Sequence, residues 1–234
     1  MTPQHAPESL AVITGFAPGI GVCLAEKLLN QGYTVAGLSR SSKGLSQPAE
    51  NFHAFACDVT KPESVGQAFT AIKADLGSPT VLVYNAAELL VRDFMAIAPE
   101  DFERVWRTMC FGALLCAQQV LPDMLALGQG TLLFSGATAS IRGSANFAAF
   151  ASAKFALRGL VQSLARQYGP QGIHVIHTLL DGVIWGDRAE NQFQLERGAC
   201  MEPDDIATTY LHLIQQNPST WTQEIDLRPW NERY

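Results

Sequence analysis

Short β-rich runs alternate with helix-like segments along the whole chain, and this alternation limits the folds that are open to it. The predicted strands cover residues 10–14, 33–39, 52–57, 80–84, 131–135, 173–179 and 221–227. The predicted helices cover 20–28, 62–76, 99–127, 147–168 and 203–216, and the third is bent or broken near Gly112 or Pro122. Strands joined by crossover helices pair in parallel and are covered on both faces. The sequence therefore predicts an α/β fold, a doubly wound parallel sheet with helices on both faces.

The composition is that of one globular domain. The chain has 234 residues, of which 47% are hydrophobic, and this is enough for a substantial core. No change in composition, internal repeat or linker divides it, so residues 1–234 are predicted to form a single domain. The formal net charge of -6 and the lack of a basic stripe argue against binding to nucleic acid.

Nothing in the sequence predicts a secreted, membrane or metal-binding protein. The first nine residues have no basic start, and no apolar stretch approaches the roughly 18 residues that a membrane span needs. The histidines have no metal-ligand spacing. The cysteines form no CxxC pair, which is typical of reduced, buried thiols: Cys23, Cys57, Cys110, Cys116 and Cys200. We therefore expect a cytoplasmic protein.

A glycine-rich turn stands between the first predicted strand and the first predicted helix. The segment TGFAPGIG, residues 14–21, does not have the GxGxxG spacing, so its position in the chain gives the signal its specificity. Glycine lets the backbone turn sharply and approach a pyrophosphate, and the helix behind it offers free N–H groups and a positive dipole end. An ordinary glycine-rich turn is the alternative. The strand–turn–helix context favours a nucleotide site in a Rossmann-type fold.

Further segments follow this turn in the order found in one known family. Residues 57–59 (CDV) resemble a segment that contacts adenine, residues 84–87 (YNAA) resemble an Asn-Asn-Ala-Gly turn, and residues 150–154 (FASAK) resemble a Tyr-x-x-x-Lys motif. With the TGxxxGxG turn, these segments resemble the short-chain dehydrogenase/reductase family over most of the chain. The resemblance implies a dinucleotide cofactor held by Gly15, Ala17, Gly19, Ile20, Gly21, Ser39, Arg40, Asp58, Val59, Asn85, Ala86, Lys154 and Val183.

The end of the second predicted strand bears on which dinucleotide is bound. An acidic residue there would accept hydrogen bonds from the adenosine ribose and favour NAD. This chain has Ser39 and Arg40, followed by Ser41, Ser42 and Lys43. Arg40 offers a planar, permanently charged donor to a 2′-phosphate. We therefore predict NADP, with NAD as the alternative and a solvated surface arginine as the simplest interpretation of Arg40.

The expected catalytic positions depart from the family. There, a tyrosine exchanges a proton with the substrate oxygen while hydride moves to or from the nicotinamide, supported by a lysine, a serine and an asparagine. Lys154 is present, but Phe150 stands at the tyrosine position and Met109 at the asparagine position, while the serine position falls near Ala137 or Thr138. A lost general acid costs roughly 10²- to 10⁴-fold in rate. We expect Phe150 to form an apolar wall on the substrate side of the nicotinamide and Lys154 to contact the ribose.

Three other groups could stand in for the missing acid. Thr138 could bind a substrate oxygen, but a hydroxyl of such high pKa is a poor acid. Asp181 should lie at the carboxyl end of the sixth strand, where ligands bind in open α/β sheets, although a loop-capping role is the favoured interpretation. Lys154 could donate a proton if it were partly desolvated.

Two functions remain open. The favoured one is an NADP(H)-dependent oxidoreductase with altered chemistry, acting on a small organic substrate that needs little acid help, such as a protonated imine or an activated alkene. The alternative is a catalytically silent dinucleotide binder, either a sensor or an inactive partner subunit. A flavodoxin-like domain would not explain Asp58, Asn85 and Lys154 in their order.

Two features concern the outside of the domain. The helices at about 101–127 and 147–169 are rich in Ala and Leu around their circumference, as helices that bury one face in the domain and another in a partner subunit often are. Proteins of the family that the chain resembles pair through these helices, so the resemblance implies a homodimer or homotetramer. Residues 184–199 have no readable motif, and residues 227–230 could cover the substrate pocket or an interface.

Overall fold

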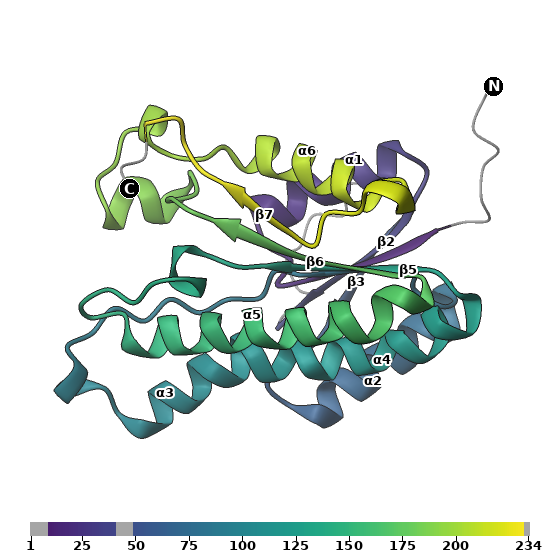
Figure 1. Cartoon of the computed structure of the whole chain (residues 1–234), viewed down its shortest axis with the longest axis horizontal. Coiled ribbons are helices and arrows are strands. Elements are labelled where there is room, and N and C mark those ends of the chain that lie inside the picture. Colours follow the sequence, from purple (N-terminus) through teal and green to yellow (C-terminus); the bar gives the residue numbers. More distant parts are fainter. Residues whose placement is uncertain (1–8, 41–48, 232–234) are drawn as a thin grey trace.

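The computed structural model describes residues 9–40 and 49–231, and within these ranges the strands form one parallel sheet. The strand order is β3-β2-β1-β4-β5-β6-β7 (Figure 1). The strands are β1 (Leu10–Thr14), β2 (Thr34–Ser39), β3 (Phe52–Ala56), β4 (Val81–Tyr84), β5 (Gly130–Ser135), β6 (Ile173–Leu180) and β7 (Glu224–Leu227). β1, β2, β4, β5 and β6 are buried along most of their length, as strands covered on both faces are, whereas the edge strand β3 is mostly half-buried.

Helices cover both faces of this sheet (Figure 1). On one face lie α1 (Ile20–Asn30) and α6 (Pro203–Ile214), which pack against each other. The other face is covered by α2 (Pro62–Leu76), α4 (Gly112–Leu127) and α5 (Ala148–Tyr168), with α3 (Pro99–Trp106) leading into α4. Each layer encloses its own apolar cluster of buried residues. The predicted doubly wound α/β fold is therefore confirmed.

The chain reverses its direction of travel across the sheet at β1. β1 pairs with β2 on one side and with β4 on the other, so the connections after β1 and β4 leave the sheet edge in opposite directions. Such a switch point opens a crevice at the carboxyl ends of the strands, which is where ligands bind in open α/β sheets.

The long helix predicted over 99–127 is interrupted at the earlier of its two suggested positions. A π-helical turn, Arg107–Phe111, separates α3 from α4, whereas Pro122 lies inside α4 without ending it. The Tyr84 hydroxyl donates a hydrogen bond of 2.5 Å to the Thr108 carbonyl within this turn. A Cβ at Gly112 would lie 2.3 Å from that hydroxyl, so only glycine leaves room for the contact.

The same helix also corrects the expectation about apolar stretches. Taken together, Pro99–Leu127 is long and apolar enough to cross a membrane by length and composition alone. Its buried residues, including Ala113, Ala117 and Val120, belong to the apolar cluster beneath the sheet. A helix that packs in the core of a globular domain meets the same criteria of length and composition.

The last strand begins later than predicted. Residues 218–220 form a 3-10 turn in which the Ser219 amide donates a hydrogen bond to the Asn217 side chain, and β7 starts only at Glu224. Trp221 stacks on His174 with 4.7 Å between ring centroids, so its side chain packs on the sheet edge before the strand begins. α6 ends at Ile214, two residues earlier than expected.

Candidate active site

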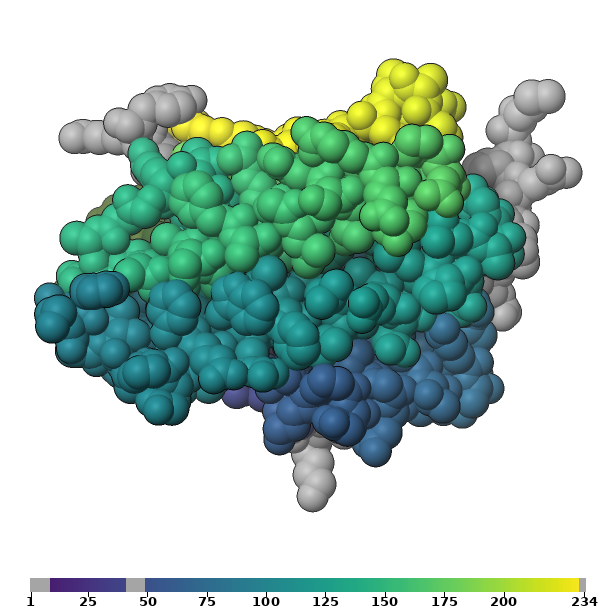
Figure 2. Space-filling model, turned by 60° about the horizontal axis from the view of Figure 1, so that its bottom comes forward, coloured from purple at the N-terminus to yellow at the C-terminus, as the bar shows by residue number. Residues whose placement is uncertain are grey.

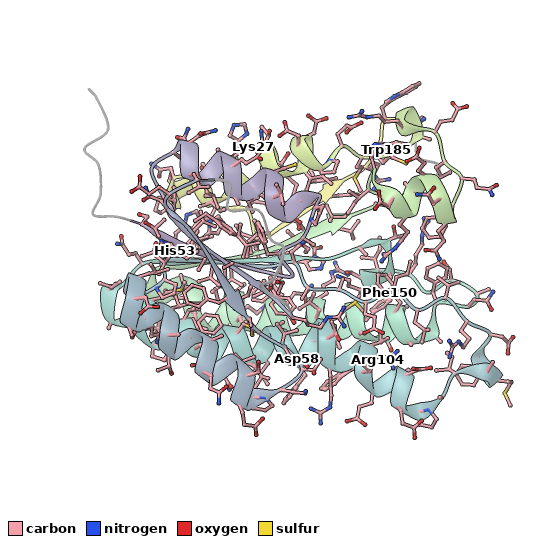
Figure 3. All side chains as sticks on the ribbon, turned by 180° about the vertical axis from the view of Figure 1, so that it is seen from behind. Lys27, His53, Asp58, Arg104, Phe150 and Trp185 are labelled. Atoms are coloured by element: carbon pink, nitrogen blue, oxygen red, sulfur yellow. The ribbon has the colours of Figure 1, made fainter. Side chains whose placement is uncertain are left out.

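A cleft of about 1330 Å³ opens at the carboxyl ends of the strands, over the switch point. Its walls come from the turns after β1, β4, β5 and β6 and from the first turns of α5. Phe150 lines it on the α5 side and Trp185 on the side of the segment after β6, as Figure 3 shows. The predicted residues that line this cleft are Gly15, Ala17, Gly19, Ile20, Gly21, Asn85, Thr138, Phe150, Lys154 and Val183.

The glycine turn is built for close approach. Gly15 has a φ of 66°, and a Cβ there would lie 2.6 Å from the Ala86 Cα, so the turns after β1 and β4 touch through their backbones. Gly19 has a φ of 112° and precedes α1, where no side chain caps the helix start. The N–H groups of that first turn therefore face the cleft with a favourable dipole for an anion.

Other predicted cofactor residues lie away from the cleft lining. The Asp58 carboxylate accepts hydrogen bonds from the Thr60 amide and hydroxyl at 3.1 and 2.7 Å, and Val59 is buried in the core. Ala86 is buried beneath Gly15. Ser39 is the last residue of β2 and Arg40 follows it, while residues 41–43 lie outside the described part of the chain.

Lys154 is nearly completely buried on α5, with only 3% of its surface exposed. Its Nζ donates a hydrogen bond of 2.7 Å to the Ser135 carbonyl at the end of β5. Burial lowers the pKa of Lys154 to about 8, because the charged ammonium loses its hydration. The amine lies 5.8 Å from the centroid of the Phe150 ring. Lys154 can therefore hold a cleft ligand as a donor near neutral pH.

The two departures from the expected catalytic set lie in one apolar cluster. Met109 is fully buried with Val105, Ala149 and Ala153, and Phe150 packs against this group. Phe150 also contacts Phe147 edge-on, with 6.4 Å between ring centroids. Neither position therefore has a side chain that could carry a proton, and both side chains take part in the packing of this apolar cluster.

Asn85 is held by a hydrogen-bond network that the sequence did not reveal. Its side-chain oxygen accepts from the Ser135 hydroxyl at 2.9 Å, and that hydroxyl also contacts the Tyr210 hydroxyl at 2.8 Å. Tyr210 reaches Thr178 at 2.7 Å, and burial raises the pKa of Tyr210 to about 12. Tyr210 occupies the apolar face of α6, where the helical pattern alone indicates only a core residue.

Thr138 and Asp181 meet in the cleft, which changes the interpretation of both. The Thr138 hydroxyl donates a hydrogen bond of 2.5 Å to Asp181 Oδ1. Arg228 lies 3.4 Å from Asp181 Oδ2, and Arg142 lies 4.0 Å from Oδ1. Asp181 lines the cleft with a buried carboxylate and contacts side chains, so the favoured loop-capping interpretation is wrong. Its partners lie too far away in the sequence for the spacing to have indicated them.

The described residues contain no group of three His, Cys, Asp or Glu side chains that could hold a metal ion.

Comparison with known proteins agrees with this geometry. The family model for short chain dehydrogenases matches residues 9–191. Carbonyl reductase family member 4 of Danio rerio is 30% identical over 220 residues, covering 88% of this chain and 91% of that protein. A short-chain dehydrogenase structure from Rhodopseudomonas palustris is 31% identical with a TM-score of 0.82, covering 95% of this chain and 99% of that one. An NADPH-bound short chain oxidoreductase from Pseudomonas aeruginosa PAO1, containing an atypical catalytic center, has a TM-score of 0.86 at 22% identity and covers 97% of each chain.

The buried position of Lys154 makes stability depend on pH. The folded chain should lose the Lys154 proton at about pH 8, whereas the unfolded chain keeps it up to the ordinary lysine value of 10.5. Between these values the unfolded state binds more protons, so the free energy of unfolding should rise with pH. Urea unfolding of the wild type and of Lys154→Met across this window measures the effect as the difference between the two curves. A difference that is constant with pH would contradict it.

Proposed function

Because the chain belongs to the short-chain dehydrogenase family, we propose that it is an NADP(H)-dependent oxidoreductase acting on a small organic substrate. Hydride transfer is the chemistry that the nicotinamide supplies when it is bound. One observation supports the proposal most directly. The glycine turn and Lys154 line the cleft where a cofactor would bind, while apolar side chains occupy the expected catalytic positions 150 and 109.

The residues of the cleft fit a dinucleotide. The backbone contact at Gly15 and the uncapped start of α1 suit a pyrophosphate, which needs N–H donors and room for close approach. Lys154 would hold the nicotinamide ribose through its ammonium group. Asn85, fixed by Ser135, would lie against the cofactor at the turn after β4.

NADP is preferred over NAD in this proposal because of Arg40. Arg40 is exposed at the end of β2, next to the switch point, and can pair with a 2′-phosphate.

Arg40→Ala should weaken NADPH binding by about 10- to 100-fold and leave NADH binding nearly unchanged, since a charge-assisted phosphate contact is lost. Calorimetric titration of wild type and variant with both cofactors measures this. Equal losses for the two cofactors would argue against phosphate recognition by Arg40, and no binding of either cofactor would refute the proposed function.

The alternative of a catalytically silent binder finds less support in the packing. Decay of an active site leaves polar neighbours without partners, and this is costly when they are buried. Here Met109 and Phe150 pack together, and Thr138 is hydrogen-bonded to Asp181. The residues at the expected catalytic positions are thus packed or hydrogen-bonded to one another, as expected for an enzyme that acts on another substrate.

Phe150→Tyr should leave ketone reduction near the background rate, because Thr138 directs its proton to Asp181 and Met109 fills the position of the asparagine. NADPH oxidation with a panel of ketones measures this, with unchanged NADPH affinity as the control for folding. The double variant Phe150→Tyr, Met109→Asn is the matched second arm. Strong ketone reduction by the single variant would instead indicate an otherwise intact, silenced site.

We also propose that the protein is cytoplasmic and forms a homodimer or homotetramer through α3, α4 and α5. These helices lie side by side on one face, as Figure 2 shows. The face exposes large apolar side chains, namely Phe102, Trp106 and Phe155, which are 39%, 37% and 45% exposed. Burial of such rings stabilises subunit contacts. Sedimentation at micromolar concentration should give a multiple of the 25.4 kDa chain mass, and a monomer would contradict the proposal.

A further inference from the structure

The reaction centre offers hydrogen-bond acceptors where a carbonyl substrate would need donors. A carbonyl oxygen can only accept hydrogen bonds, and it gains negative charge as hydride arrives. Phe150 has no donor, and the Thr138 hydroxyl donates to Asp181. Lys154 donates one hydrogen bond to the Ser135 carbonyl, and its remaining N–H groups would hold the ribose in the proposed function. What Thr138 and Asp181 can still offer a ligand is their oxygen lone pairs.

Asp181 has capacity left for a ligand. An ionised carboxylate can accept about four hydrogen bonds, and Asp181 receives one, from Thr138. The two nearby cations are less closely bound: Arg228 lies at 3.4 Å and also pairs with Asp226, while Arg142 lies at 4.0 Å with its side chain half exposed. Asp181 is therefore a buried carboxylate at the cleft, ion-paired with Arg228 at 3.4 Å and with Arg142 at 4.0 Å, that keeps lone pairs for a ligand.

The surrounding wall suits a cation as well. The rings of Phe147, Phe150 and Phe193 line the cleft, and aromatic faces attract cations without offering a strong donor. Among the described residues, Arg142 and Arg228 are ion-paired with Asp181, and the cleft lining also contains Lys154, Arg188 and Arg197. Arg142 is half exposed and has the longer of the two contacts, so a cationic ligand would compete with Arg142 for the carboxylate.

We propose that the substrate end of this cleft binds a cationic nitrogen, that of an iminium ion, with Asp181 as its counter-ion and Thr138 as a second acceptor. The inference rests on the proposed function and names its substrate class. The iminium carbon would accept the hydride that NADPH supplies on its oxidation to NADP⁺, and the C=N π electron pair would move to nitrogen, which yields a neutral amine. Atoms and charges balance without any proton from the protein, so the tyrosine is not required.

The test uses the full chain and a permanently charged probe. N-methyl-3,4-dihydroisoquinolinium serves as substrate, and 1-tetralone as its neutral counterpart of similar shape. N,N-dimethyl-tetrahydroisoquinolinium, which cannot accept hydride, reports binding alone by calorimetry. We expect turnover of the iminium in preference to the ketone, and binding of the inert cation. Asp181→Asn should reduce both the kcat/KM for the iminium and the affinity for the inert cation by at least roughly tenfold, as expected on removal of a buried charge partner.

Asp226→Asn is the matched control, because Asp226 also pairs with Arg228 but does not line the cleft. It should change cation affinity by no more than about twofold, as is typical of an exposed pair. Asp181→Glu should retain cation binding in part, which separates loss of charge from loss of folding. Equal effects of Asp181→Asn and Asp226→Asn would reduce Asp181 to an anchor for Arg228 and overturn the inference.

The remaining outcomes separate the two proposals. If NADPH binds and neutral ketones or alcohols turn over while the inert cation does not bind, the proposed function stands and the inference is wrong. If NADPH does not bind, the proposed function fails. The affinity of the inert cation for wild type and Asp181→Asn still decides the inference in that case, since it needs no hydride.

Discussion

The whole arrangement depends on the contact between two backbones, the turn after β1 and the turn after β4. At Gly15 this contact leaves no space for a side chain, and the left-handed backbone there suits glycine. Because the chain reverses across the sheet at this point, the contact also fixes where the crevice opens. The start of α1, Asn85 and the ends of β5 and β6 are thereby brought around one cavity.

The two ends of the cleft present different chemical groups to a ligand. The end near the glycine turn presents N–H groups, as a phosphate ligand requires. The other end combines an apolar wall around Phe150 with the oxygen acceptors of half-buried Thr138 and buried Asp181. A fold can keep one ligand and change the other in this way because the two are bound by different loops.

The sequence predicted the elements with strong local signals. Buried strands and the glycine turn depend on neighbouring residues, so their positions were right within a few residues. The break in the long helix was foreseen, but its position depends on Tyr84, which contacts the turn from 24 residues away. The sequence suggests a loop-capping role for Asp181 because it cannot indicate the hydrogen bond to Thr138, which lies 43 residues away. Tyr210 was missed for the same reason, since it meets Ser135 across 75 residues.

The packing of Met109 against Phe150 also has a consequence for how the site can evolve. An asparagine restored at position 109 would bury an amide among apolar side chains, at a cost of about 1 to 3 kcal/mol. That loss is a large fraction of the net stability of a domain. A single Met109→Asn change therefore meets a stability barrier before it can contribute to catalysis, because its amide would lie among apolar neighbours.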